Sequence, residues 1–240
     1  MNQNQIEKHS IAQSIFFHLF PGALIGTFCF LFRQTANNFG YPAILALVLA
    51  VAFILIPTEL GYLLYQGKKR TGRYSLNGII HLKSSLPWWQ FLIWVLVVFA
   101  AIGILFALMK PVEGFLKDRI FFWIPDLDNG LDGKYSRTIL TITYFLYFLF
   151  VVILGPIVEE LYFRGYLLPR MKGKFAVLIH SFLFAAYHFF TPWLIISRTI
   201  GFLPLILVAK KKSITMAMAV HILCNSVDFV TAFVFIMNIS

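Results

Sequence analysis

Long apolar runs separated by short polar segments dominate the pattern of the chain. Several runs exceed the roughly 18 apolar residues that cross a bilayer as a helix, and they are far longer than a buried strand. The pattern therefore predicts an all-α protein, a polytopic transmembrane helical bundle of about seven spans, or eight if a broken run counts twice. The predicted spans are residues 14–32, 43–65, 88–109, 140–168, 175–190, 193–208 and 214–239.

Composition and charge strengthen this prediction. The chain is 60% hydrophobic and 12% charged, whereas soluble domains are about 45–50% apolar and about 25% charged. Its net charge of +10 does not indicate a nucleic-acid partner, because the basic residues gather in short loops, as they do on the cytoplasmic side of membrane proteins. We therefore expect an integral protein of the plasma membrane with a cytoplasmic N-terminus. The basic loops contain Lys68, Lys69, Arg70, Arg73 and Lys83, then Arg170, Lys172 and Lys174, then Lys210, Lys211 and Lys212.

Two adjacent carboxylates interrupt the fourth apolar run, in the segment GPIVEELYFR at residues 155–164. A charged carboxylate at the centre of a bilayer costs roughly 2.5–3.5 kcal/mol on insertion scales, so an acid there indicates a functional site. Glu160 and Arg164 are four residues apart and share a helix face, whereas Glu159 has no local partner. This division favours a general base, Glu159, beside a structural ion pair. The alternative is a charge cluster that reaches from a helix end to the membrane interface.

Further polar residues lie in the fifth and seventh runs, where His188 ends the segment FLFAAYH and His221 and Asn225 share a helix face in HILCN. Helix rise places Glu160 about 16 Å, His188 about 21 Å and His221 about 14 Å from the basic loops. This shared depth predicts that Glu159, His188, His221 and Asn225 converge on one cavity. We expect that cavity to open toward the basic, cytoplasmic side.

The other polar residues of the apolar runs are interpreted as structural. Arg198 and Asp228 are expected to form a buried ion pair, and Glu59 to close a second pair or to lie near the inner interface. A lone histidine on an apolar face is usually a satisfied core residue, and His18 and His180 are interpreted in this way.

Three motifs occur in order on successive apolar runs: E-E-x-x-x-R in EELYFR, F-x-x-x-H in FAAYH and H-x-x-x-N in HILCN. Together they resemble the CPBP family of CAAX prenyl-protein endopeptidases and bacteriocin-processing enzymes, also called the Abi family. The resemblance covers the chain from about residue 140 onward. It divides the chain into N-terminal transmembrane helices with their connecting loops (1–136) and a CPBP/Abi catalytic core (137–240).

The resemblance implies an intramembrane endopeptidase, a hydrolase that acts on a membrane-associated protein or peptide. Prenylated CAAX-type proteins and bacteriocin or signal-peptide precursors are the substrate classes that it suggests. By the resemblance, Glu159 and His188 activate a water molecule, while His221 and Asn225 stabilise the oxyanion at the scissile carbonyl. The supporting residues that it implies are Glu160, Arg164 and Phe184.

The resemblance leaves the metal open, since the family is commonly called a metalloprotease family and a metal-free glutamate mechanism is also argued for it. If Zn²⁺ is bound, the resemblance assigns it to His188, His221 and Glu159, with one position left for water. The H-E-x-x-H spacing of zinc helices does not occur in the sequence. No cofactor therefore follows from the residues alone.

Two other classes of protein place ionisable groups inside a membrane. A transporter or channel does so, but the sequence has no internal repeat and its polar constellations lie in the second half. A non-catalytic membrane partner, such as a bacteriocin-immunity protein or a sensor-kinase regulator, is the alternative to an enzyme. Beyond the lipid bilayer and a membrane-associated substrate, the sequence predicts no partner and no oligomeric state.

Overall fold

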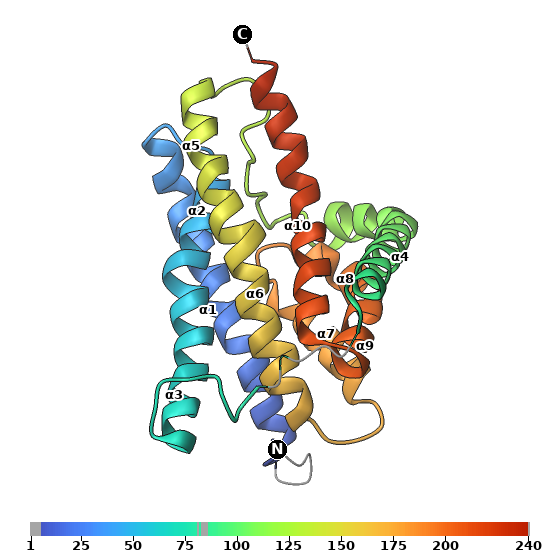
Figure 1. The fold of residues 1–240 in the computed structure, drawn as a ribbon. Coiled ribbons are helices and arrows are strands. Elements are labelled where there is room, and N and C mark those ends of the chain that lie inside the picture. The colour runs from blue at the N-terminus through green and yellow to red at the C-terminus, as the bar shows by residue number, and fades with distance from the viewer. Residues whose placement is uncertain (1–5, 81, 83–85, 240) are drawn as a thin grey trace.

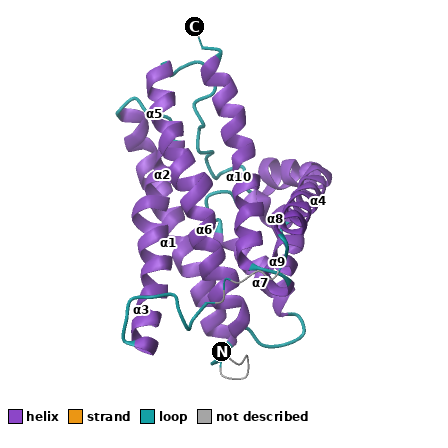
Figure 2. Ribbon diagram, viewed as in Figure 1, coloured by secondary structure: helices purple, strands orange, loops and turns teal. Residues whose placement is uncertain are grey.

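The protein is a bundle of helices in a computed structural model that describes residues 6–80, 82 and 86–239 (Figures 1 and 2). Within these residues no β-strand is formed, and loops connect the helices. The predicted all-α class is therefore confirmed. Lys83 of the first predicted basic loop lies outside the described residues.

Several helices continue without a break through segments of wider π-helical turns, or end in a short 3-10 turn. These segments carry the labels η2 to η7. Two continuous helices are built in this way before residue 121, and a third contains the paired acids. In chain order the elements are α1 (Ile11–Asn38); α2 (Ile44–Ala50), η2 (Val51–Leu60) and α3 (Gly61–Thr71); α4 (Trp88–Phe115) and η3 (Leu116–Ile120); α5 (Arg137–Tyr147), η4 (Phe148–Leu154), α6 (Gly155–Glu159), η5 (Glu160–Leu167) and η6 (Leu168–Arg170); α7 (Ala176–Tyr187); η7 (Pro192–Leu194); α8 (Ile195–Gly201); α9 (Leu203–Lys211); and α10 (Ile214–Met237).

Among the described residues, five helices are long and apolar enough to cross a membrane, or up to six if the pair Pro192–Gly201 and Leu203–Lys211, bent by 46°, is one span. The predicted span at residues 175–190 forms only α7, whose 12 residues rise about 18 Å. A hydrocarbon core is about 30 Å thick. The predicted count of seven full spans is therefore wrong for α7, which ends before His188. The five long helices are Ile11–Asn38, Ile44–Thr71, Trp88–Ile120, Arg137–Arg170 and Ile214–Met237.

α1 and α10 run in one direction, and the continuous helices α2–α3 and α5–η6 run in the other, so their connecting loops gather at two ends of the bundle (Figure 1). The first end holds the N-terminal segment and the basic loops that follow α3, η6 and α9, and we call it the basic end. There the backbone N–H of His9 donates to the carbonyl oxygen of Arg170 over 2.9 Å, and Ile80 and Ile214 pack against Gly165. The loops that were predicted to share one side of a membrane therefore lie together.

The second end holds the loop between α1 and α2, the loop at residues 121–136 and the C-terminus (Figure 1), and we call it the opposite end. The loop at 121–136 turns inward between the helices. Two hydrogen bonds hold it in position. The backbone N–H of Ile44 donates to the carbonyl oxygen of Asp128 over 2.8 Å, and the hydroxyl of Tyr144 donates to the backbone carbonyl oxygen of Asn129 over 2.8 Å. This loop is therefore fixed against α2 and α5, although much of it remains exposed.

A glycine allows α1 to pack closely against the end of α7. The space that a Cβ atom at Gly22 would occupy is already filled by the carbonyl oxygen and the ring of Tyr187. Only a residue without a side chain permits this approach of the two backbones. The contact fixes the end of α7, and with it the position of His188, the next residue in the chain.

Replacing Gly22 by Ala is expected to lower the thermal stability of the detergent-solubilised protein. Overpacking of this kind costs roughly 1–3 kcal/mol, because the added methyl group meets backbone atoms that cannot rotate away. The matched control is Gly103→Ala on α4, where a Cβ atom would meet nothing within 4 Å and where Ala favours the helix by roughly 0.5–1 kcal/mol. Equal melting temperatures for the two variants would contradict the close approach.

Candidate active site

The paired acids lie where the helix passes from α6 to η5. Pro156 precedes them, and a proline lacks the N–H of a helical hydrogen bond and displaces the carbonyl four residues before it. π-Helical turns lie on either side of the short α6, and such turns are frequent at functional sites. All eight residues of η5 are buried, so this helix is covered on every side, and Glu159 and Glu160 are buried with it, with 6% and 0% of their surface exposed.

Glu160 has two partners. Its Oε1 lies 3.0 Å from Nη1 of Arg164 and 2.9 Å from Nδ1 of His221. The side chains of Glu160 and Arg164 are both fully buried, so the predicted ion pair is present. The contact with His221 was not predicted by the sequence analysis. It gives Glu160 a direct influence on the orientation of the imidazole.

His221 stands between the two acids. A carboxylate only accepts hydrogen bonds, so Nδ1–H of His221 donates to Glu160 and fixes the tautomer. Its Nε2 then faces Glu159, whose Oε2 is 3.7 Å away. This separation is longer than a hydrogen bond, so His221 does not bind the Glu159 carboxylate directly and a small molecule can be held between them.

His188 occupies the turn immediately after α7. Its Nδ1 is 2.9 Å from the carbonyl oxygen of Phe184, which only accepts, so Nδ1–H donates and Nε2 is left as a proton acceptor. The rings of Phe184 and Tyr187 meet the imidazole edge to face, at centroid distances of 5.0 and 4.9 Å. Packing and one hydrogen bond therefore fix this ring outside any regular helix.

Asn225 and Phe184 complete the set of predicted residues. The Nδ2 of Asn225 donates to the carbonyl oxygen of Val151 over 2.9 Å, and its second hydrogen is still available as a donor. Phe184 is fully buried. The guanidinium of Arg164 lies 3.8 Å from the centre of its ring, which is a favourable cation–π geometry. Phe184 thus supports the ion pair as well as His188.

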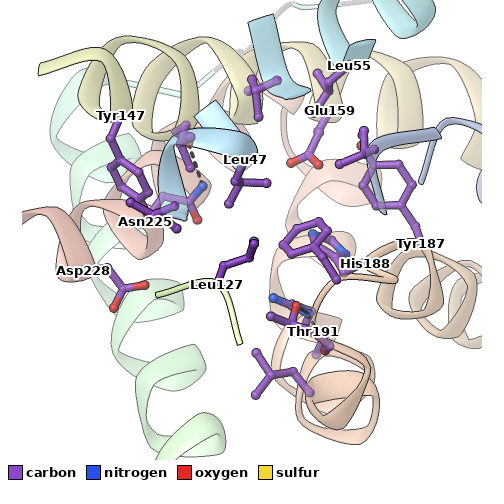
Figure 3. A pocket seen from close by; sticks show the side chains of 18 of the residues that line it. Leu47, Leu55, Leu127, Tyr147, Glu159, Tyr187, His188, Thr191, Asn225 and Asp228 are labelled. Carbon is purple, nitrogen blue, oxygen red and sulfur yellow. Dashed lines mark hydrogen bonds between the residues drawn. The ribbon is translucent and has the colours of Figure 1, made fainter. Parts of the chain in front are cut away.

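One cavity of about 660 Å³ brings the four predicted catalytic residues together. Glu159, His188, His221 and Asn225 all line it, and Figure 3 shows three of them around the space. Its volume lies within the range of about 300–1,000 Å³ that is typical of ligand sites. The predicted convergence on one cavity is therefore confirmed.

The direction of the cavity differs from the prediction. Its walls continue to Ile44, Lys117 and residues 126–129, which lie at the opposite end. Of the described residues, none in the three basic loops lines it. The prediction that it opens toward the basic loops is therefore wrong, because helix rise estimates the depth of a residue but not which side of it is filled by other side chains.

One polar contact near the cavity was not predicted. The hydroxyl of Tyr187 donates to Oε1 of Glu59 over 2.8 Å, and both residues are buried. Glu59 thus has a phenol as its hydrogen-bond partner rather than the expected cation. Tyr187 lies next to Glu159 in the cavity wall (Figure 3), which brings a third acid close to the site. The sequence signal was weak, because Glu59 and Tyr187 are 128 residues apart.

The ion pair expected between Arg198 and Asp228 is not formed among the described residues. Nη1 of Arg198 instead donates to Oγ1 of Thr191 over 2.8 Å, because the turn before α8 brings that threonine close. Both charged residues line the cavity. The two histidines that were assigned to the core do lie there: Nε2 of His18 and Nδ1 of His180 are 2.8 Å apart, and both are fully buried.

The residues present do not fit a metal centre. The described part of the chain contains no group of three His, Cys, Asp or Glu side chains that could hold a metal ion. His188, His221 and Glu159 line the same cavity, but in the described part of the chain they do not form a group that could hold a metal ion. We therefore derive no step through zinc.

Comparison with known families supports the family resemblance that the three motifs predict. Residues 141–227 match the family model of the type II CAAX prenyl endopeptidase Rce1-like proteins. All three motifs lie within the matched residues, so the resemblance to the CPBP and CAAX protease family is confirmed there. At the level of the family, the match and the apolar helices indicate a membrane-embedded CAAX-type endopeptidase, which is a hydrolase. No curated protein and no solved structure matches the chain.

Proposed function

We propose that this protein is an intramembrane endopeptidase that hydrolyses peptide bonds of a membrane-associated protein or peptide with water activated by Glu159 and His188. The observation that carries the proposal is the shared cavity lined by Glu159, two histidines and an amide, with the second acid, Glu160, bound to His221 behind its wall. Ionisable groups are costly inside a membrane, so those that are present indicate a functional site.

The geometry supports a sequence of proton transfers. Glu159 removes a proton from a water molecule that is also bound by Nε2 of His188, and the resulting hydroxide attacks the scissile carbonyl carbon. Nε2 of His221, 3.7 Å from Glu159, can then take over this proton. In that state His221 becomes a donor to the oxyanion beside Nδ2 of Asn225. The proton finally leaves with the amine of the cleaved bond, which restores both groups.

Glu160, Arg164 and Phe184 have a supporting role in this proposal. Glu160 holds the Nδ1–H of His221 at 2.9 Å, so that Nε2 points to the reacting groups. Arg164 neutralises Glu160 inside the bundle, and Phe184 packs under the guanidinium. Prenylated CAAX-type proteins and bacteriocin or signal-peptide precursors are the substrate classes proposed, and the cavity has room for an extended peptide segment.

Comparison of membrane peptides from cells that express wild type or Glu159→Ala is expected to reveal new chain ends only with the wild type. Mass spectrometry of peptide termini measures this directly. The control is Asp118→Ala, which removes an exposed carboxylate of η3 outside the cavity and should leave the termini unchanged. If wild type and Glu159→Ala give identical termini at equal protein levels, the proposal fails and a non-catalytic membrane partner becomes the better interpretation.

A further inference from the structure

The catalytic cavity is closed toward the basic end by a layer of packed side chains. The layer consists of Phe163 and Leu167 on η5 and of Met216 and Val220 on the first turns of α10, all of them fully buried. These residues lie between Glu159 and the basic loops. The fully buried ion pair of Glu160 and Arg164 belongs to the same layer. A peptide that came from the basic end would have to displace this part of the core.

Toward the opposite end the cavity reaches solvent. Two of its lining residues there, Lys117 and Asp126, form an ion pair of 2.7 Å whose side chains are 43% and 54% exposed. Asn129, which also lines the cavity, is exposed as well. These polar and charged side chains line the cavity and are not covered by other parts of the protein, which marks this end as the entrance.

The distribution of basic residues indicates which end of the bundle lies on which side of the membrane. Lys and Arg are retained on the cytoplasmic side. The last turns of α3, η6 and α9 and the loops that follow them carry ten described basic residues, Lys68, Lys69, Arg70, Arg73, Arg170, Lys172, Lys174, Lys210, Lys211 and Lys212. At the opposite end, the loop at 121–136 contains Asp126, Asp128 and Asp132 beside one lysine, Lys134, and the helix turns that flank it add the basic residues Lys117, Arg119 and Arg137. That loop and its flanking turns carry four basic residues, against ten at the basic end. The basic end is therefore the cytoplasmic end, and the entrance lies on the other face.

We infer that the site receives its substrate from the non-cytoplasmic face of the membrane. The substrate is then an exported peptide, or the extracytoplasmic segment of a membrane protein, rather than the tail of a cytoplasmic protein. This inference rests on the proposed function and adds the side from which the cavity is entered. It also selects among the substrate classes, because a precursor that has crossed the membrane can reach this entrance and a prenylated cytoplasmic protein cannot.

Labelling of single cysteines with a membrane-impermeant maleimide tests the side of the entrance. In a background of Cys29→Ser and Cys224→Ala, Asn129→Cys at the entrance should be labelled on intact cells. The matched variant Arg73→Cys, in a basic loop, should be labelled only in inside-out vesicles. Labelling of Arg73→Cys on intact cells, with Asn129→Cys protected, overturns the inference.

Cleavage by sealed vesicles of each orientation tests the access of substrate. With a mixture of water-soluble synthetic peptides, right-side-out vesicles should cleave, and inside-out vesicles should cleave only after detergent opens them. Cleavage confined to inside-out vesicles, or equal in both sealed forms, overturns the inference. If vesicles of both kinds are inactive after detergent, the proposed function fails, whereas the labelling of Asn129→Cys still decides the side of the entrance.

Discussion

Glu159→Gln is expected to abolish peptide-bond hydrolysis while the protein still accumulates in the membrane and unfolds near the wild-type temperature. Glutamine keeps the size of the side chain but cannot accept a proton from water, and a general base contributes roughly 10²–10⁴-fold to the rate. Among the described residues, His221 at 3.7 Å is the nearest ion-pair partner of the Glu159 carboxylate, so folding depends little on its charge. The measurement is the cleavage rate of the purified variant, on a substrate identified from the membrane peptides, together with its melting temperature.

Normal cleavage by Glu159→Gln would show that Glu159 is not the general base. If a folded Glu160→Gln protein were inactive at the same time, the two acids would have exchanged roles. If both variants cleaved normally, the chain would not be the hydrolase proposed here.

Glu160→Gln is expected to lower stability as well as activity. The substitution leaves the guanidinium of Arg164 fully buried without its charge partner, and breaking a buried pair in this way costs roughly 3–5 kcal/mol. It also weakens the hydrogen bond that orients His221. Protein level in the membrane, melting temperature and cleavage rate should therefore all fall together, in contrast to Glu159→Gln.

Glu113→Gln is the matched control for this second prediction. Glu113 is also a largely buried acid in an ion pair, at 7% side-chain exposure, but its partner Lys110 is 70% exposed. An exposed lysine that loses its partner remains solvated, so the cost should stay at about 0–1 kcal/mol. Equal destabilisation by both substitutions would show that the burial of Arg164 is not the cause.

The sequence predicted those parts of the site that depend on local geometry. Glu160 and Arg164 pair because residues four apart share a helix face. The common depth of Glu159, His188, His221 and Asn225 followed from helix rise, and it was enough to predict one cavity. The fold class followed in the same way from the length of the apolar runs, since a run of that length in a membrane must be helical.

Contacts between distant residues were not predicted correctly. His221 binds Glu160 across 61 residues, and that contact depends on how α10 packs against η5. Arg198 was assigned to Asp228 but binds Thr191, because the turn that brings Thr191 close carries no distinct sequence signal. The entrance was placed at the wrong end for a related reason. In the sequence, the bulky residues that close the basic end, such as Phe163 and Leu167, cannot be distinguished from other apolar residues of a transmembrane helix.

The position of His221 and Asn225 on the last helix has a consequence for biogenesis. The pair of Glu160 and Arg164 lies within one helix and can form as soon as that helix does, so the nascent chain carries this acid into the bilayer already neutralised. His188 follows after α7, and the last two groups arrive only with α10, whose His221 and Asn225 contact Glu160 and the carbonyl oxygen of Val151. Under the proposed function, a chain that is still being synthesised is therefore a harmless membrane protein, and it becomes a protease only when its final helix is inserted.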